Sequence, residues 1–265
     1  MILASATPTG WALGLAAALA YAAPAAAGQR LSASGIRIAL SAAWLLHALL
    51  LVHGLLADPP RFGFAPALSI TAWLVLTVYV VESQLYPHLR ARWTLAGLGS
   101  LAVLLALIFP GTPVLGGSAW MPLHWALGIA SYGLFASAVV HAWIMTRTEQ
   151  AIRRAADAHT GLPLLTLERL TFRFVAVGFG LLSATLLAGW LFGARSGWGP
   201  AGWRWDHKTV FSVLSWLTFA ALLLGRVRFG WRGRRAVRMV YAGALLLLLA
   251  YVGSRFVIEV LLGRT

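Results

Sequence analysis

Eight apolar segments, each close to the length of one membrane crossing, take up most of this chain and leave only short links between them. A helix needs about 20 apolar residues to cross the hydrocarbon core of a bilayer. With 60% hydrophobic and 11% charged residues, the composition is that of a multi-pass membrane protein and not of a soluble domain. We therefore predict an all-α, polytopic membrane helix bundle of about eight transmembrane helices. The predicted spans are Thr9–Ala27, Ile36–Ala57, Phe64–Tyr86, Trp93–Phe109, Met121–Thr146, Phe172–Phe192, Thr209–Gly225 and Val237–Leu262.

Because these spans nearly consume the 265 residues, we expect a single integral membrane domain over residues 1–265. The first span has an alternative interpretation, since the run from Pro24 to Gly28 resembles a small-residue cleavage site after an apolar stretch. No Lys or Arg precedes Arg30, so the basic region of a signal peptide is missing. We favour a retained helix.

The basic residues are distributed unequally between the two sides of the predicted membrane. Of the 21 Lys and Arg residues, fifteen lie in the links after the first, third, fifth and seventh spans. The positive-inside rule places those links in the cytoplasm and both termini in the periplasm, as expected of a protein of the bacterial inner membrane. The formal charge of +14 follows the ends of the spans, which argues against nucleic acid as a partner. Because the chain has no Cys, it has neither disulfides nor thiolate metal sites of its own.

Two basic links on the predicted cytoplasmic side have distinct patterns. The link Arg147–Arg173 is the longest polar stretch, and Glu149 and Arg153 are spaced for an ion pair on an exposed helix. The run Gly230–Arg235 predicts a tight basic turn, with membrane topology and contact with anionic lipid as its expected roles.

The link between the sixth and seventh spans is the most informative for function. It holds three tryptophans, followed directly by Asp206 and His207. Tryptophan offers a flat face and one N–H donor and favours the membrane–water boundary, so this cluster beside a histidine could hold a flat, metal-containing ligand such as haem. The alternative is an aromatic belt that only anchors the protein. Asp206 is a candidate helix cap and also a candidate member of the cofactor site, where it would hold Lys208, Arg204 or a histidine ring in place. The tryptophans are Trp198, Trp203 and Trp205.

Histidine is the usual axial ligand of haem iron, and seven histidines are available. His124 and His207 fall near the outer starts of the fifth and seventh spans, so both are candidate ligands of one haem iron. His53, near the outer end of the second span, is the reserve ligand. For His47 and His141, a helix–helix hydrogen bond and a functional role stay open. We expect solvated or interfacial roles for the two histidines of the cytoplasmic links, His88 and His159.

The tryptophan-rich link resembles a known motif. Its residues Trp198-Gly199, Trp203-Arg204-Trp205-Asp206 and Lys208 resemble the "WGxxWxWDxKE" motif of the cytochrome c assembly family, the haem-handling membrane proteins of the CcsA/CcmC type. Similar runs flank the link, and the resemblance covers residues of about 36–262, strongest between Pro122 and Arg226. The small eight-helix layout and the Gly-Trp-Arg-Gly-Arg-Arg turn are most similar to the YpjD branch of that family.

The resemblance implies that b-type, non-covalently bound haem is presented at the periplasmic face on the tryptophan-rich platform. His124 matches the family's first external histidine. His207 and Thr209 stand where the motif has Pro and an acid. The family's final external histidine has no counterpart here, and Leu224 replaces a histidine near the inner end of the seventh span.

These departures favour haem handling or transfer over full cytochrome c haem lyase activity, and they assign no catalytic side chain. Arg204 and Lys208 could pair with haem propionates. The expected partners are haem, membrane lipid, and apocytochrome c or another membrane subunit. The alternative function is that of a haem-free membrane scaffold or regulatory partner that retains the fold.

Overall fold

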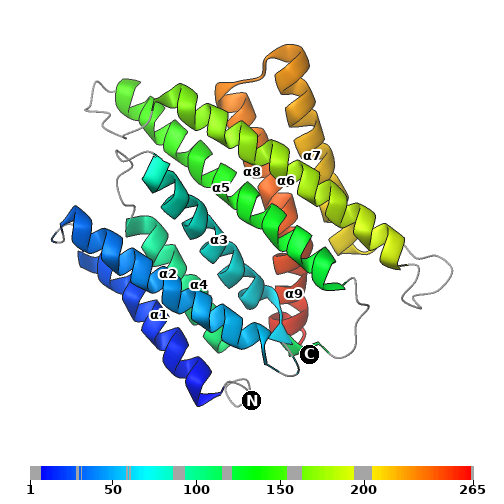
Figure 1. Cartoon of the computed structure of the whole chain (residues 1–265). Coiled ribbons are helices and arrows are strands. Elements are labelled where there is room, and N and C mark those ends of the chain that lie inside the picture. The colour runs from blue at the N-terminus through cyan, green and yellow to red at the C-terminus, as the bar shows by residue number, and fades with distance from the viewer. Residues whose placement is uncertain are drawn as a thin grey trace. The chain divides into compact units, whose positions relative to one another are not determined.

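The computed structural model describes residues 7–27, 30, 32–57, 59, 61–85, 93–114, 121–153, 163–193 and 205–263, and most of these are helical (Figure 1). Seven of the described helices are long and apolar enough to cross a membrane. The prediction of an all-α, polytopic membrane helix bundle is confirmed. The elements are α1 Pro8–Ala27, α2 Ala33–Leu55, β1 Arg61–Phe62, α3 Phe64–Leu85, α4 Trp93–Ile108, β2 Thr112–Pro113, α5 Met121–Arg153, α6 Leu164–Gly193, α7 His207–Phe229, α8 Gly233–Leu248, η2 Leu249–Gly253, α9 Ser254–Phe256 and η3 Val257–Leu261.

The predicted count of eight spans depends on α4. This helix is apolar but has only 16 residues, which corresponds to about 24 Å of helix against a hydrocarbon core of about 30 Å. The other seven predicted spans each coincide with a long apolar helix among the described residues. The count of eight and the periplasmic position of both termini stay predictions.

The contacts divide the chain into two compact units, one of Met1–Gly116 with Arg255–Thr265 and one of Gly117–Ser254. In the first unit, α1 packs against α2 and α4, and α3 packs against α4 and α2. The rings of Trp44 and Trp73 stack at 5.2 Å between centroids and join α2 to α3. The strands β1 and β2 pair in antiparallel register, with Arg61 opposite Pro113.

A buried polar triad lies at the centre of this first unit. The His47 side chain is fully buried on α2. Its Nδ1 lies 3.3 Å from the hydroxyl of Tyr21 on α1, and its Nε2 lies 2.8 Å from the hydroxyl of Ser69 on α3. The helix–helix hydrogen bond considered for His47 is therefore present, and it ties three helices together.

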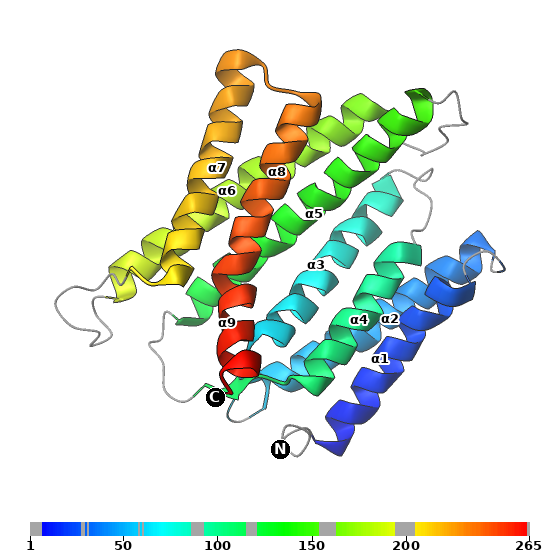
Figure 2. The same ribbon diagram turned by 180° about the vertical axis from the view of Figure 1, so that it is seen from behind.

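In the second unit, α5 and α6 lie side by side over most of their length, and α7 and α8 form a helical hairpin (Figure 2). The hairpin packs closely against α5, and its two helices pack closely against each other. The rings of Phe135 and Phe219 stack at 3.8 Å between centroids, and the Ser215 hydroxyl donates to the Gly243 carbonyl at 2.8 Å. A side chain at Gly243 would collide with the Phe219 ring, so glycine permits this contact.

Helices α5 and α6 both extend beyond the predicted spans. Helix α5 continues to Arg153, and α6 begins at Leu164 instead of Phe172. The extension of α5 carries the expected ion pair, in which Arg153 Nη2 lies 2.6 Å from Glu149 Oε1. Hydropathy located only the apolar part of each helix, because a helix continues into the polar region wherever its backbone bonds and side-chain pairs are satisfied.

Candidate functional site

His124 lies in the first turn of α5 and packs against α6. A side chain added at Gly189 of α6 would meet His124 Cε1 at 3.4 Å, so the imidazole lies close over the backbone of that helix. The backbone of Thr185, one turn earlier in α6, also contributes a hydrogen bond to the imidazole ring. His124 Nδ1 is buried and makes no hydrogen bond to any described residue. Buried polar atoms without a partner are uncommon in native structures, so this nitrogen is a candidate ligand atom.

Lys208, in the first turn of α7, brings a positive charge to this imidazole. Its charge acts on the His124 ring, and its ammonium lies 5.3 Å from the centroid of the Tyr251 ring. Tyr132 of α5 donates a hydrogen bond to the Leu247 carbonyl of α8 and so holds the neighbouring helix in place. Residues from α5, α6, α7 and η2 therefore converge at one end of the second unit. The ammonium of Lys208 could pair with the carboxylates of a bound molecule whose metal ion is coordinated by the His124 imidazole.

Asp206 caps α7, as its sequence position predicts. Its Oδ1 accepts a hydrogen bond from the Thr209 backbone N–H at 2.8 Å. Partial burial raises the pKa of the Asp206 carboxyl, but the Thr209 hydrogen bonds and the charges of Lys208 and His207 outweigh it. The pKa therefore lies below its usual value, and the carboxylate is ionised at neutral pH. The cap fixes where α7 begins, and so fixes the position of Lys208.

Replacement of Asp206 by alanine is expected to lower the free energy of unfolding by about 1 kcal/mol through loss of the cap. Because the pKa is lowered by folding, this contribution is present above the pKa of the unfolded carboxyl, about 3.9, and is lost as pH falls through the folded value. Denaturation curves in detergent, recorded for the wild type and for Asp206→Ala at several pH values, measure the difference in the free energy of unfolding. The difference should shrink in acid, whereas an equal difference at pH 3 and pH 7 would contradict the cap.

A family model described as cytochrome C assembly protein matches residues 32–262. The chain belongs to the cytochrome c assembly protein family. A relative in Azospirillum brasilense, an uncharacterized 28.8 kDa protein in the nifR3-like 5' region, is 34% identical over 215 residues, which cover 76% of this chain and 77% of that protein. The match to this relative is consistent with the resemblance to the YpjD branch of the family.

Shorter matches link this family member to cytochrome c biogenesis proteins CcsA. The protein of Gloeobacter violaceus is 34% identical over 94 residues, which are 36% of this chain and 27% of that protein. The protein of Prochlorococcus marinus is 38% identical over 90 residues, 34% and 28% of the two chains. The matched part therefore spans about a quarter of the length of these CcsA proteins. No solved structure matches the chain.

The other predicted ligands of this cytochrome c assembly protein have different surroundings. His207 is exposed as the first residue of α7, and Trp205 beside it is 71% exposed. Trp198 and Trp203 lie outside the described residues. His53 belongs to the first unit, where its Nε2 lies 3.0 Å from the Thr7 hydroxyl.

Two contributors to the site could not be found from the sequence of this family member. Gly189 and Tyr251 are unremarkable residues within apolar spans. Only the packing of α5 against α6 and of α7 against η2 brings them to His124 and Lys208. His141, by contrast, lies further along α5. Its side chain is buried, and its Nδ1 bonds the Ser137 carbonyl of the same helix at 2.8 Å.

Proposed function

We propose that this cytochrome c assembly family protein binds haem non-covalently, with His124 as an axial ligand of the iron. The observation that carries the proposal is the buried Nδ1 of His124, which has no hydrogen-bond partner among the described residues. An imidazole nitrogen with no internal partner is the type of atom that ligates haem iron. The family membership supports haem as the ligand.

We propose that other side chains bind the remaining parts of the haem. Lys208 supplies a charge for a propionate, with Arg204 as its proposed companion. Trp205 is exposed and has a flat face for the porphyrin, and we propose that Trp198 and Trp203 complete this platform. His207 is the proposed second ligand, and His53 is the reserve. Bound haem would supply the redox and coordination chemistry, while these side chains bind and orient it.

We further propose that this haem is handed to apocytochrome c or to another membrane subunit at the periplasmic face of the bacterial inner membrane. The names of the CcsA relatives support such a partner, although the matches cover only 27% and 28% of those proteins. In this proposal the whole chain is one integral membrane domain with both termini in the periplasm.

Single cysteines report this orientation without interference, because the chain has no Cys of its own. We expect a membrane-impermeant maleimide to label Ala57→Cys, two residues after the end of α2, in intact spheroplasts. Arg153→Cys, at the end of α5, should react only after the membrane is opened. The reverse pattern would show that the orientation is inverted.

The proposed function is tested by the absorption and pyridine haemochrome spectra of the detergent-purified protein. We expect a Soret band in the wild type that is lost in His124→Ala and shifted in His207→Ala. His141→Gln is the matched control, since His141 lies on the same helix and bonds its own backbone, and it should retain the band. If the wild type takes up no haem even when haem is supplied, the proposal fails and a scaffold or regulatory role takes its place.

A further inference from the structure

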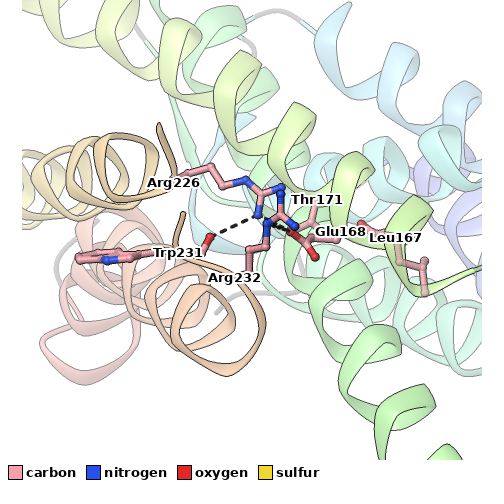
Figure 3. Close-up of polar contacts among 6 residues, drawn as sticks. All are labelled: Leu167, Glu168, Thr171, Arg226, Trp231 and Arg232. Atoms are coloured by element: carbon pink, nitrogen blue, oxygen red, sulfur yellow. Dashed lines mark hydrogen bonds and ion pairs between the residues drawn. The ribbon is translucent and has the colours of Figure 1, made fainter. Parts of the chain in front are cut away.

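A second polar cluster lies where α6 begins and where α7 turns into α8 (Figure 3). The carboxylate of Glu168, near the start of α6, forms an ion pair with the guanidinium of Arg226, near the end of α7. Arg226 also donates to the Trp231 carbonyl at 3.3 Å. Arg232, the N-cap residue of α8, lies 3.6 Å from the same Glu168 oxygen. One carboxylate, whose side chain is only 13% exposed, is therefore shared by two arginines.

The turn between α7 and α8 has a fixed conformation. Gly230 ends α7 in the left-handed region with φ 62°, which glycine adopts without strain. The Trp231 N–H donates to the Gly225 carbonyl at 3.1 Å, and the indole packs on Gly225 so closely that no side chain would fit there. Arg235 stacks over the same indole at 3.8 Å. The backbone therefore presents the remaining arginines in a defined arrangement.

Positive charge exceeds negative charge strongly at this end of the second unit. Glu168 is the only acidic residue in the segments 164–173 and 226–238, which hold eight arginines. Arg226 and Arg232 pair with Glu168. The other six arginines have no carboxylate in these two segments with which to pair. The exposed ones among them are Arg169, Arg173, Arg228, Arg234, Arg235 and Arg238.

Exposed apolar side chains flank these arginines. Val227 is 82% exposed and Phe229 is 74% exposed, and they stand on either side of Arg228 at the end of an apolar helix. Arginine next to exposed apolar and aromatic side chains at the end of a span is typical of the boundary between lipid tails and headgroups. A soluble acidic partner would not require Val227 and Phe229 to be exposed.

We infer that Arg228, Arg234, Arg235 and Arg238, here called the arginine surface, bind the headgroups of acidic phospholipids. The charge of the surface is complementary to the phosphates, and each arginine near an anionic membrane contributes additively. Glu168 does not weaken this attraction, because its charge is already matched by Arg226 and Arg232. This binding is independent of haem, because the arginine surface lies at the end of α7 and the start of α8, whereas Lys208 lies in the first turn of α7.

The test compares phosphatidylglycerol with phosphatidylcholine by native mass spectrometry of the protein in neutral detergent. The test variant is Arg234→Gln/Arg238→Gln, because both side chains are exposed and outside the Glu168 cluster. The control variant is Arg37→Gln/Arg153→Gln, which removes the same charge from two other exposed positions. We expect the wild type and the control to prefer phosphatidylglycerol, and the test variant to bind it about 10- to 30-fold more weakly.

Three results would overturn the inference. The first is a wild type with no preference between the two lipids. The second is an equal loss in the test and control variants, which would mean that only net charge matters. The third is displacement of the bound lipid by millimolar inorganic phosphate, which would identify a site for the free anion. A thermal-unfolding midpoint of the test variant close to that of the wild type without added lipid checks that the variant is folded.

Discussion

Replacement of Glu168 by glutamine is expected to lower the free energy of unfolding by about 3 kcal/mol. The substitution keeps the shape of the side chain but leaves Arg226 without its counter-charge in a part-buried position, where both partners of the ion pair are mostly covered. Removal of one partner from a buried ion pair is costly because the other charge stays desolvated. The measurement is a denaturation titration with sodium dodecyl sulfate in mixed micelles.

An exposed ion pair of the same protein provides the control. Glu149→Gln breaks the pair with Arg153, whose side chain is 62% exposed, and should cost only about 0.5 kcal/mol. The double substitution Glu168→Gln/Arg226→Met should recover much of the lost stability, because neither charge is then buried alone. If Glu168→Gln and Glu149→Gln have the same small effect, the cluster at Glu168 does not stabilise the fold.

His47→Ala is expected to lower the free energy of unfolding by about 3 kcal/mol. The imidazole is fully buried, so its removal leaves a cavity and takes hydrogen-bond partners from Tyr21 and Ser69 at once. The same titration measures the loss. His53→Ala is the matched control on the same helix, since its contact with Thr7 is exposed and should contribute less than about 1 kcal/mol.

A double-mutant cycle separates the hydrogen bonds of His47 from its volume. In the background Tyr21→Phe, the cost of His47→Ala should fall, because the Tyr21 hydroxyl no longer needs a partner. Equal costs in both backgrounds would assign the effect of His47 to packing alone.

The sequence predicted the helices well and their ends less well. Each apolar segment of the predicted list is a helix because hydropathy reports which residues favour lipid. It does not report where the backbone bonds stop, so the predicted spans fell short of Arg153 at the end of α5 and of Leu164 at the start of α6. The spacing of Glu149 and Arg153 did predict an exposed helix at the end of α5. The cap at Asp206 was predictable, because a cap depends only on local residues.

Partners far apart in the sequence were not predictable. The candidate role of His124 came from its place near the start of a span, but the lack of a partner for its Nδ1 depends on how α5 packs against α6. The pairing of His47 with Tyr21 and Ser69 likewise needs the positions of three helices. Of the predicted tryptophan platform, only Trp205 lies among the described residues.

The distance along the chain between Glu168 and Arg226, 58 residues, has a consequence for the order of events during biosynthesis. The pair can form only after α7 has been made and has packed against α6, so both arginines of the cluster are still unpaired while the helices enter the membrane. At that stage Arg226 and Arg232 count fully as orientation signals. A chain that lacks Glu168 should therefore insert with the normal orientation and lose stability only when its helices assemble.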